Sequence, residues 1–269
     1  MSAFDPLASV PAEGIIDCHG HLGHWHNFLV PMPEGDQMLA MMDRCRIREV
    51  WISAHLSIGP DAPAGNRLVA ELARAHPGRI RGYAVVNPNY PAIAVSEMER
   101  AFDELGLEAL KIHPSTHDYP VNGPHYRPVF EFAARRGTFV LTHTWGGTRT
   151  CSPSMLREVC LDFPEVPIIV GHSGGPEEGL QEALDLAEEF PNAHLDLTGC
   201  SHEWGRVERM VARIGDERIL FGSDLPFLDP RPAIGVVAGS KLSAGSKQRI
   251  FRDNMAAIVA GIRSSKGTA

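Results

Sequence analysis

The stretch GIIDCHGHLGHWH, residues 14–26, begins as an apolar run and ends in four closely spaced histidines. These are His19, His21, His24 and His26, and they make up nearly a third of the 13 histidines in the 269-residue chain. The apolar start is typical of a buried strand, and neutral imidazole is a common metal ligand. The stretch therefore predicts a strand that delivers histidines to a metal site at its end.

Seven further apolar runs follow the first along the chain. All are rich in Val, Ile and Leu and nearly continuous, as strands buried on both faces of a sheet are. Together with the first run, they span residues 14–20, 49–56, 80–88, 108–114, 138–144, 166–172, 193–199 and 218–224.

Helix-like segments lie between the runs. Residues 66–78, for example, place Leu68, Val69 and Leu72 on one stripe and stop at Pro77-Gly78. Strands that alternate with helices indicate a parallel sheet, and eight such units in about 250 residues indicate a closed (β/α)8 TIM barrel of the α/β class. The alternative, an open doubly wound sheet, usually carries a Gly-rich phosphate loop after its first strand, which this sequence lacks. We therefore expect a single (β/α)8 domain over residues 1–269.

Composition argues against several classes of protein. The formal net charge of −8 argues against nucleic-acid binding, which needs a basic face. No apolar run approaches membrane-spanning length, and residues 1–14 lack the basic and apolar segments of a signal peptide. The five cysteines are scattered and odd in number, which suits a reducing cytoplasm better than a disulfide framework. We expect a cytoplasmic protein that acts on a small molecule, and a homo-oligomer is compatible with these features.

Polar residues at the ends of the predicted strands are the candidate site, because the active site of such a barrel lies at the C-terminal ends of its strands. Histidines at so many strand ends would be costly in a packed core, and convergence on one or two metal ions would satisfy them together. These residues are His19, His21, His55, Lys111, His113, His143, His172 and Asp224.

The spacing of the first pair supports metal binding. Residues two apart in a strand point to the same face, so His19 and His21 can approach one ion while Cys18 and Gly20 face the helices. Imidazole suits zinc, iron or manganese, and a carboxylate such as Asp224 can complete the shell. A divalent ion lowers the pKa of bound water toward neutrality.

Four motifs give the pattern a family likeness. The segments DCHGH, LTHT, VGHSGG and LFGSDLP stand in this order on the first, fifth, sixth and eighth predicted strands. They resemble the amidohydrolase superfamily, and most of all its amidohydrolase-related branch of hydrolases, decarboxylases, hydratases and lactonases. The resemblance extends from residue 15 to about residue 259.

The resemblance implies a role for each motif residue. His19, His21, His143 and Asp224 would ligate or contact the metal, and His172 would activate water or polarise the substrate. Asp224 can also accept a proton, and His172 can orient the substrate or donate to it. The catalytic pair is thus His172 and Asp224.

The remaining polar residues leave alternatives open. Lys111 is a carboxylated bridge between two metals, a cation for a substrate carboxylate, or a charge that balances the acidic site. His113 and His55 are candidate ligands of a second ion. His202, after the seventh strand, is a candidate substrate contact. For both His55 and His202, an ordinary satisfied histidine is the alternative. His24, His26 and Trp145 are candidate substrate contacts that equally suit a solvated loop or ordinary packing.

The surplus of histidines keeps two kinds of chemistry in competition. The leading interpretation is a metal-dependent enzyme that uses metal-activated water for hydrolysis, or related decarboxylation or hydration, of a small organic acid, lactone or amide. The alternative is a TIM-barrel non-haem di-iron oxygenase that hydroxylates a small, CoA-linked compound. A barrel that binds metal without catalysis is disfavoured by the intact His172 and Asp224. The expected cofactor is one or two divalent ions of zinc, iron or manganese.

Overall fold

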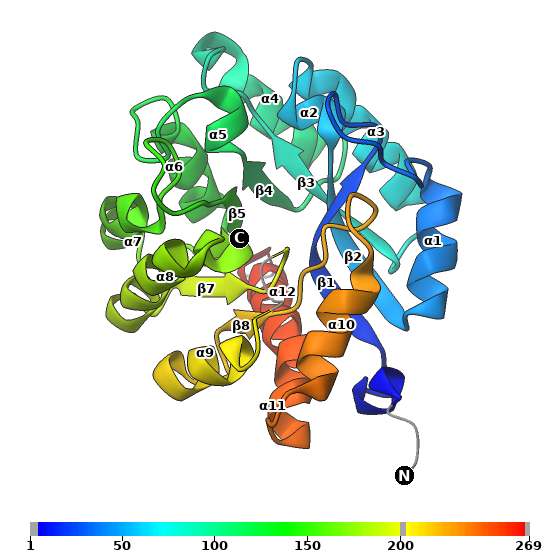
Figure 1. The fold of residues 1–269 in the computed structure, drawn as a ribbon. Coiled ribbons are helices and arrows are strands. Elements are labelled where there is room, and N and C mark those ends of the chain that lie inside the picture. The colour runs from blue at the N-terminus through cyan, green and yellow to red at the C-terminus, as the bar shows by residue number, and fades with distance from the viewer. Residues whose placement is uncertain (1–4, 200–202, 267–269) are drawn as a thin grey trace.

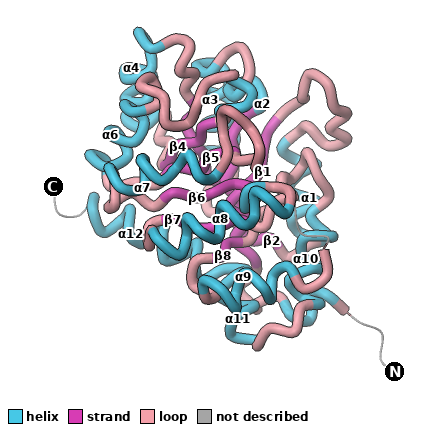
Figure 2. The backbone as a smooth tube through the Cα atoms, turned by 60° about the vertical axis from the view of Figure 1, so that its left-hand side comes forward, coloured by secondary structure: helices cyan, strands magenta, loops and turns pink. Residues whose placement is uncertain are grey.

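Eight parallel strands form one sheet in chain order. Figures 1 and 2 show the strands at the centre of the molecule. The computed structural model describes residues 5–199 and 203–266, with side chains to residue 262. The strands are β1 (Ile15–Leu22), β2 (Ile47–Ala54), β3 (Ile80–Val85), β4 (Ala109–Ile112), β5 (Val140–His143), β6 (Ile168–Gly171), β7 (Ala193–Asp196) and β8 (Ile219–Leu220). Each strand lies within or largely within one of the predicted apolar runs, so the predicted (β/α)8 barrel is confirmed.

The barrel is nearly closed between β8 and β1. The segment after β8 runs along β1, where the backbone N–H of Cys18 donates to the carbonyl of Phe221 at 2.9 Å. Farther along, the N–H of Asp224 donates to the carbonyl of His19 at 2.8 Å, and the N–H of His21 donates to that of Leu225 at 2.7 Å. These bonds fix Asp224 directly beside the histidines of β1.

Helices surround the strands on the outside of the sheet (Figure 2). They are α1 (Gly35–Arg44), α2 (His55–Ile58), α3 (Ala62–Ala75), α4 (Pro91–Asp103), α5 (Pro114–His117), α6 (Arg127–Arg136), α7 (Arg157–Asp162), α8 (Glu177–Glu189), α9 (Arg206–Ile214), α10 (Pro230–Gly239), α11 (Ala244–Gln248) and α12 (Asn254–Lys266). Short 3-10 helices cover Pro6–Ser9, Pro153–Leu156 and His172–Gly174, and a π-helical turn covers Arg249–Asp253.

The core has two layers. The larger layer lies between strands and helices, and the smaller one fills the barrel interior. Trp51 of β2, Tyr83 of β3 and Phe139, which directly precedes β5, pack in this interior with Met255 and Ile258 of α12. Figure 1 shows α12, in red, beside β8 and β1. Apolar packing thus fills the barrel below the carboxyl ends of the strands, where the polar residues gather.

A bulge in β1 sets the direction of its histidines. Asp17 pairs with Val50 and Gly20 with Ile52, so β1 has one residue more than β2 over this interval. Cys18 accordingly packs in the barrel interior, and the prediction that it faces the helices is wrong. The extra residue reverses the alternation, so that the next side chain, His19, also points inward.

The segment after β4 is pinned to the barrel by a buried histidine. The Nε2 of His117 donates to the carbonyl of Ile58 at 2.9 Å, and its Nδ1 accepts from the hydroxyl of Tyr126 at 2.5 Å. Burial lowers the pKa of His117 to about 4, partly offset by the bond to Ile58. The neutral form of His117 therefore holds the segment after β4 in place.

This histidine gives a pH-dependent stability. Because the pKa of His117 is about 4 in the folded chain and about 6.5 when unfolded, the unfolded state binds more protons between these values. The free energy of unfolding should fall as pH decreases from 6.5 toward 4. The free energy of unfolding is measured with urea at pH 7 and at pH 5. Between these pH values it should decrease by about 2 kcal/mol less in His117→Gln than in the wild type. An identical loss in both proteins would contradict the assignment.

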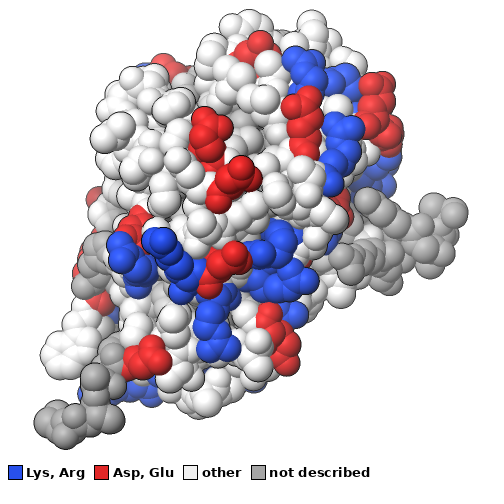
Figure 3. All heavy atoms as spheres, turned by 90° about the vertical axis from the view of Figure 1, so that its right-hand side faces the viewer, with Lys and Arg blue, Asp and Glu red and all other residues white. Residues whose placement is uncertain are grey.

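Charges of both signs alternate on the face of the molecule shown in Figure 3. Lys and Arg side chains stand next to Asp and Glu side chains across this face, so it carries no uniform basic patch. Among the described residues, no helix has the length and apolarity needed to cross a bilayer.

Candidate metal centre and active site

A cavity of about 180 Å³ lies at the carboxyl ends of the strands. It brings together most of the residues predicted from the strand ends, with aromatic and aliphatic side chains as further walls. Its lining is His19, His21, Trp25, His55, Ile58, His113, His143, His172, Asp224 and Phe227.

Two imidazoles and one carboxylate converge at the buried end of this cavity. The Nε2 atoms of His19 and His21 lie 3.3 Å and 3.1 Å from Oδ1 of Asp224. Ligand atoms bound about 2.1 Å from one ion are themselves about 3.0–3.4 Å apart, so each of these two distances fits a pair of ligands on one divalent cation. Within the described parts of the chain, one group has three donor atoms within 4.8 Å of one another: His19, His172 and Asp224. The nitrogen and oxygen donors suit manganese, iron or zinc.

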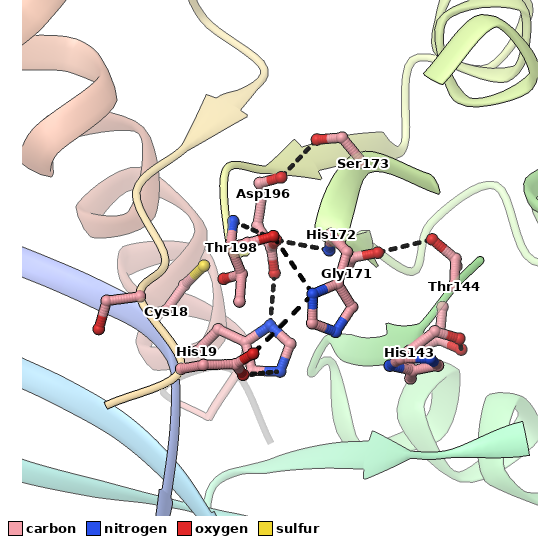
Figure 4. A network of polar contacts seen from close by, with 12 residues as sticks. Cys18, His19, His143, Thr144, Gly171, His172, Ser173, Asp196 and Thr198 are labelled. Carbon is pink, nitrogen blue, oxygen red and sulfur yellow. Dashed lines mark hydrogen bonds and ion pairs between the residues drawn. The ribbon is translucent and has the colours of Figure 1, made fainter. Parts of the chain in front are cut away.

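Asp196, at the end of β7, orients His19 (Figure 4). The Nδ1 of His19 donates to Oδ2 of Asp196 at 2.7 Å, which leaves the Nε2 lone pair facing the cavity. The other oxygen of Asp196 accepts from the backbone N–H groups of His172 at 2.7 Å and Thr198 at 3.0 Å. One carboxylate thus fixes the tautomer of a candidate ligand and the backbone of a candidate acid-base residue.

Sequence reasoning missed Asp196, although it lies within the seventh predicted strand. We predict that Asp196→Asn binds metal about 10–100-fold more weakly, since losing a carboxylate behind a histidine ligand has that effect. Titration of the purified protein with Mn²⁺ checks this. Unchanged affinity would show that the His19 ring is held without Asp196.

A second buried carboxylate, Asp17, also escaped prediction and joins β1 to the segment after β8. It accepts from the backbone N–H groups of His19 and Ser223, each at 3.1 Å, and from the hydroxyl of Ser223. Burial raises the pKa of Asp17 to about 7, although these hydrogen bonds act in the opposite direction. Asp17 lies behind the site and holds the two segments that carry His19 and Asp224.

Asp224 remains ionised in this environment. Burial alone would raise its pKa, but the neighbouring His19 and His172, with the hydrogen bond from His21, outweigh burial and hold the pKa below its usual range. Its backbone has φ 61°, which turns the side chain toward the cavity. Asp224 is therefore suited to bind a cation or accept a proton.

His172 occupies the centre of the histidine cluster (Figure 4). Its ring centroid lies 5.0 Å from that of His19 and 4.6 Å from that of His143. The Nδ1 of His172 donates to the carbonyl of Thr198 at 3.2 Å and lies 4.0 Å from Oδ2 of Asp224. This bond leaves the Nε2 atom of His172 for a ligand or substrate.

His143 and His113 form a stacked pair beside this centre. Their ring centroids are 4.1 Å apart, with planes 10° apart. Burial first, and the neighbouring charged groups second, hold the pKa of both residues well below the usual range. Both rings line the cavity. The structure places His143 next to the converging ligand atoms, and its metal contact stays a prediction.

His55 supports the other side of the cavity. Its ring stacks on His21 at 4.6 Å, and its Nδ1 donates to the carbonyl of Gly23 at 2.8 Å. Burial and the neighbouring His21 lower the pKa of His55 to about 3. The hydroxyl of Ser53 lies 3.3 Å from Nδ1 of His21, so this serine can fix the His21 tautomer.

Lys111 is buried next to the candidate ligands. Its Nζ donates to Nε2 of His19 at 2.7 Å. Burial lowers the pKa of Lys111 to about 8, although Asp224 and Asp196 act to raise it. An ion bound at the same Nε2 atom would have to displace this ammonium. The carboxylated form and the substrate-binding form of Lys111 both remain predictions.

The other predicted contacts lie at or beyond the rim. His24 and His26 are exposed and line a neighbouring cavity instead. Trp145 is 41% exposed, and its ring centroid lies 6.1 Å from that of His172. His202 lies outside the described residues.

A family model described as amidohydrolase matches residues 16–259 of this chain. The chain belongs to the amidohydrolase family. The predicted resemblance is thus confirmed, and the family match covers every strand that contributes to the cavity.

Known proteins with similar sequence or structure include decarboxylases. The chain is 21% identical over 252 residues to gamma-resorcylate decarboxylase of Rhodococcus jostii, covering 73% of this chain and 75% of that protein. The structure of 2,6-dihydroxybenzoate decarboxylase from Rhizobium superposes with a TM-score of 0.75 and 18% identity, over 92% of this chain and 99% of the other. A dihydroxybenzoic acid decarboxylase from Polaromonas, solved with manganese and 2-nitroresorcinol, gives a TM-score of 0.74 and 18% identity, over 92% and 97%.

Proposed function

We propose that this amidohydrolase is a metal-dependent lyase that removes the carboxylate of a small aromatic acid as carbon dioxide. The convergence of His19 Nε2, His21 Nε2 and Asp224 Oδ1 at the end of a 180 Å³ cavity carries the proposal. The rings of Trp25 and Phe227 line the same cavity and offer apolar walls to a single aromatic ring. Similar proteins that act on dihydroxybenzoates, one of them with bound manganese, support this choice.

The chain's own residues supply positioning and a proton. A divalent ion held by the three converging atoms would draw electron density from a substrate oxygen. Cleavage of the bond between ring and carboxylate leaves an electron pair on the ring carbon, which takes up a proton as carbon dioxide departs. His172 can deliver this proton from Nε2 when its ring is doubly protonated, with Nδ1–H still donating to the carbonyl of Thr198. Asp224 is a poor proton donor because its pKa is held low.

Hydrolysis by activated water is a second candidate. The observation that favours it is the ionised carboxylate of Asp224, which lines the cavity beside the candidate cation site. In that reaction Asp224 would take a proton from water, and a lactone or amide would be the substrate.

The di-iron oxygenase alternative requires two ions per chain. The described residues contain one group of three donor atoms within 4.8 Å, from His19, His172 and Asp224. This group shares His19 and Asp224 with the proposed ligands, which supports a single ion. His55 and His113 each stack on another histidine of the cluster, at 4.6 Å and 4.1 Å. We therefore expect one ion of manganese, zinc or iron per chain.

Metal analysis and a carbon dioxide assay test the proposal together. Protein purified without oxygen is analysed for metal content and then supplied with hydroxybenzoates, simple lactones and amides under argon. We expect one ion per chain and release of carbon dioxide from at least one aromatic acid in the absence of oxygen. Hydrolysis of a lactone or amide without carbon dioxide release would favour the second candidate. Two irons and a strict need for oxygen would contradict both.

A further inference from the structure

We propose that Trp25 limits the size of the substrate by separating the catalytic cavity from a second, apolar cavity. This inference rests on the proposed function, since it concerns the acid that occupies the same site. It assigns a specificity-determining role to a residue of the loop between β1 and α1, and it names the larger acids that the loop excludes.

The second cavity has a volume of about 410 Å³, against about 180 Å³ for the catalytic one. Trp25 and His55 line both cavities, so these two side chains form the boundary between them. The other lining residues are Leu22, Gly23, His24, His26, Ala54, Leu56, Gly59, Pro60 and Leu68.

The chemistry of the second cavity suits an uncharged apolar group. Of the described residues that line it, none is Asp, Glu, Lys or Arg. Its aliphatic walls come from the end of β1, from the start of α2 and from α3. The second aromatic ring or the alkyl chain of a larger acid would bury apolar surface there. The carboxylate of the same acid would reach through the boundary toward His19 and Asp224.

Trp25 is the removable part of this boundary. His55 is fixed by its stacking on His21 and by its hydrogen bond to Gly23. Trp25 is half-buried and contacts other rings, with centroids 5.0 Å from His55 and 6.3 Å from His113. Truncation of Trp25 therefore opens the boundary without removing a hydrogen bond of His55.

Binding of two non-reacting acids tests the inference. Protein loaded with Mn²⁺ is titrated calorimetrically with benzoate, which has one ring, and with 2-naphthoate, which has two. In Trp25→Ala, the Kd of 2-naphthoate should fall by about tenfold or more relative to wild type, because the second ring leaves water for apolar walls. The Kd of benzoate should rise, since Trp25→Ala also removes an apolar wall of the catalytic cavity, so the ratio of the two Kd values is the readout.

Two further variants keep the result interpretable. Trp25→Phe retains a ring and should give a smaller gain for 2-naphthoate, which also serves if Trp25→Ala fails to fold. Trp204→Ala removes an equally large side chain that is 91% exposed and lines neither cavity, so both Kd values should stay at wild-type levels. Benzoate binding with an unchanged ratio of the two Kd values in both Trp25 variants would overturn the inference alone. Failure of benzoate to bind the Mn²⁺-loaded wild type would instead overturn the proposed function and this inference with it.

Discussion

Asp224→Ala is expected to lose the bound ion and the carbon dioxide release together while the barrel stays folded. Oδ1 of Asp224 is the atom on which Nε2 of His19 and of His21 both converge, at 3.3 Å and 3.1 Å. Removal of a residue that merely orients a ligand weakens metal binding about 10–100-fold. The loss of a ligand itself should therefore weaken Mn²⁺ binding by more than about 100-fold.

Metal content after gel filtration and turnover at saturating Mn²⁺ check this prediction. Asp185→Ala is the matched control, because Asp185 is an exposed carboxylate that pairs with Arg213 on the surface. It should keep both the ion and the activity. Full metal and full turnover in Asp224→Ala, with a wild-type circular dichroism spectrum, would remove Asp224 from the candidate centre.

The barrel could be predicted because each of its strands is recognisable from a short stretch of consecutive residues. Each strand is a short apolar run, and runs such as VPIIVGH and TFVLTHT signal burial on both faces without knowledge of their neighbours. The regular alternation of these runs with amphipathic segments then indicates a parallel barrel. The bulge at residues 17–20 was missed, since a bulge depends on the pairing of β1 with β2 and leaves no mark in the apolar pattern.

The candidate site could be predicted in part for a similar reason. His19, His21, His172 and Asp224 stand at strand ends, and strand ends meet in one place in a barrel. Asp196 was missed because its importance lies in a bond to His19, 177 residues away. Such a bond follows from the barrel geometry that brings the ends of β1 and β7 together, whereas a single acidic residue at the end of a strand has many ordinary explanations.

The backbone at the site shows how the chain holds its functional groups. His172, Ser173 and Asp224 all have positive φ values, of 61°, 46° and 61°. Such values cost an ordinary residue roughly 1–2 kcal/mol and persist where surrounding bonds enforce them. Here the N–H of His172 donates to Asp196, and the N–H of Asp224 donates to the carbonyl of His19. These bonds direct the side chains of His172 and Asp224 into one cavity.

This backbone makes asparagine the suitable replacement for His172, since asparagine tolerates positive φ better than most residues. In His172→Asn, the bonds from the backbone to Asp196 remain possible, so loss of the imidazole is the main change. We expect turnover to fall by roughly 10²–10⁴-fold, as it does when a positioned acid-base group is lost. Metal binding should persist, because His19, His21 and Asp224 still supply three ligands, the number that catalytic zinc sites take from a protein.

Single-turnover release of carbon dioxide, measured beside metal content, separates these two effects. His76→Asn is the matched control, since His76 follows α3 and lies outside the cavity lining; its turnover should equal that of the wild type. Loss of metal and turnover together in His172→Asn would make His172 a ligand, in agreement with its place in the three-atom group. Unchanged turnover with full metal would instead mean that the proton reaches the ring carbon from a group other than His172.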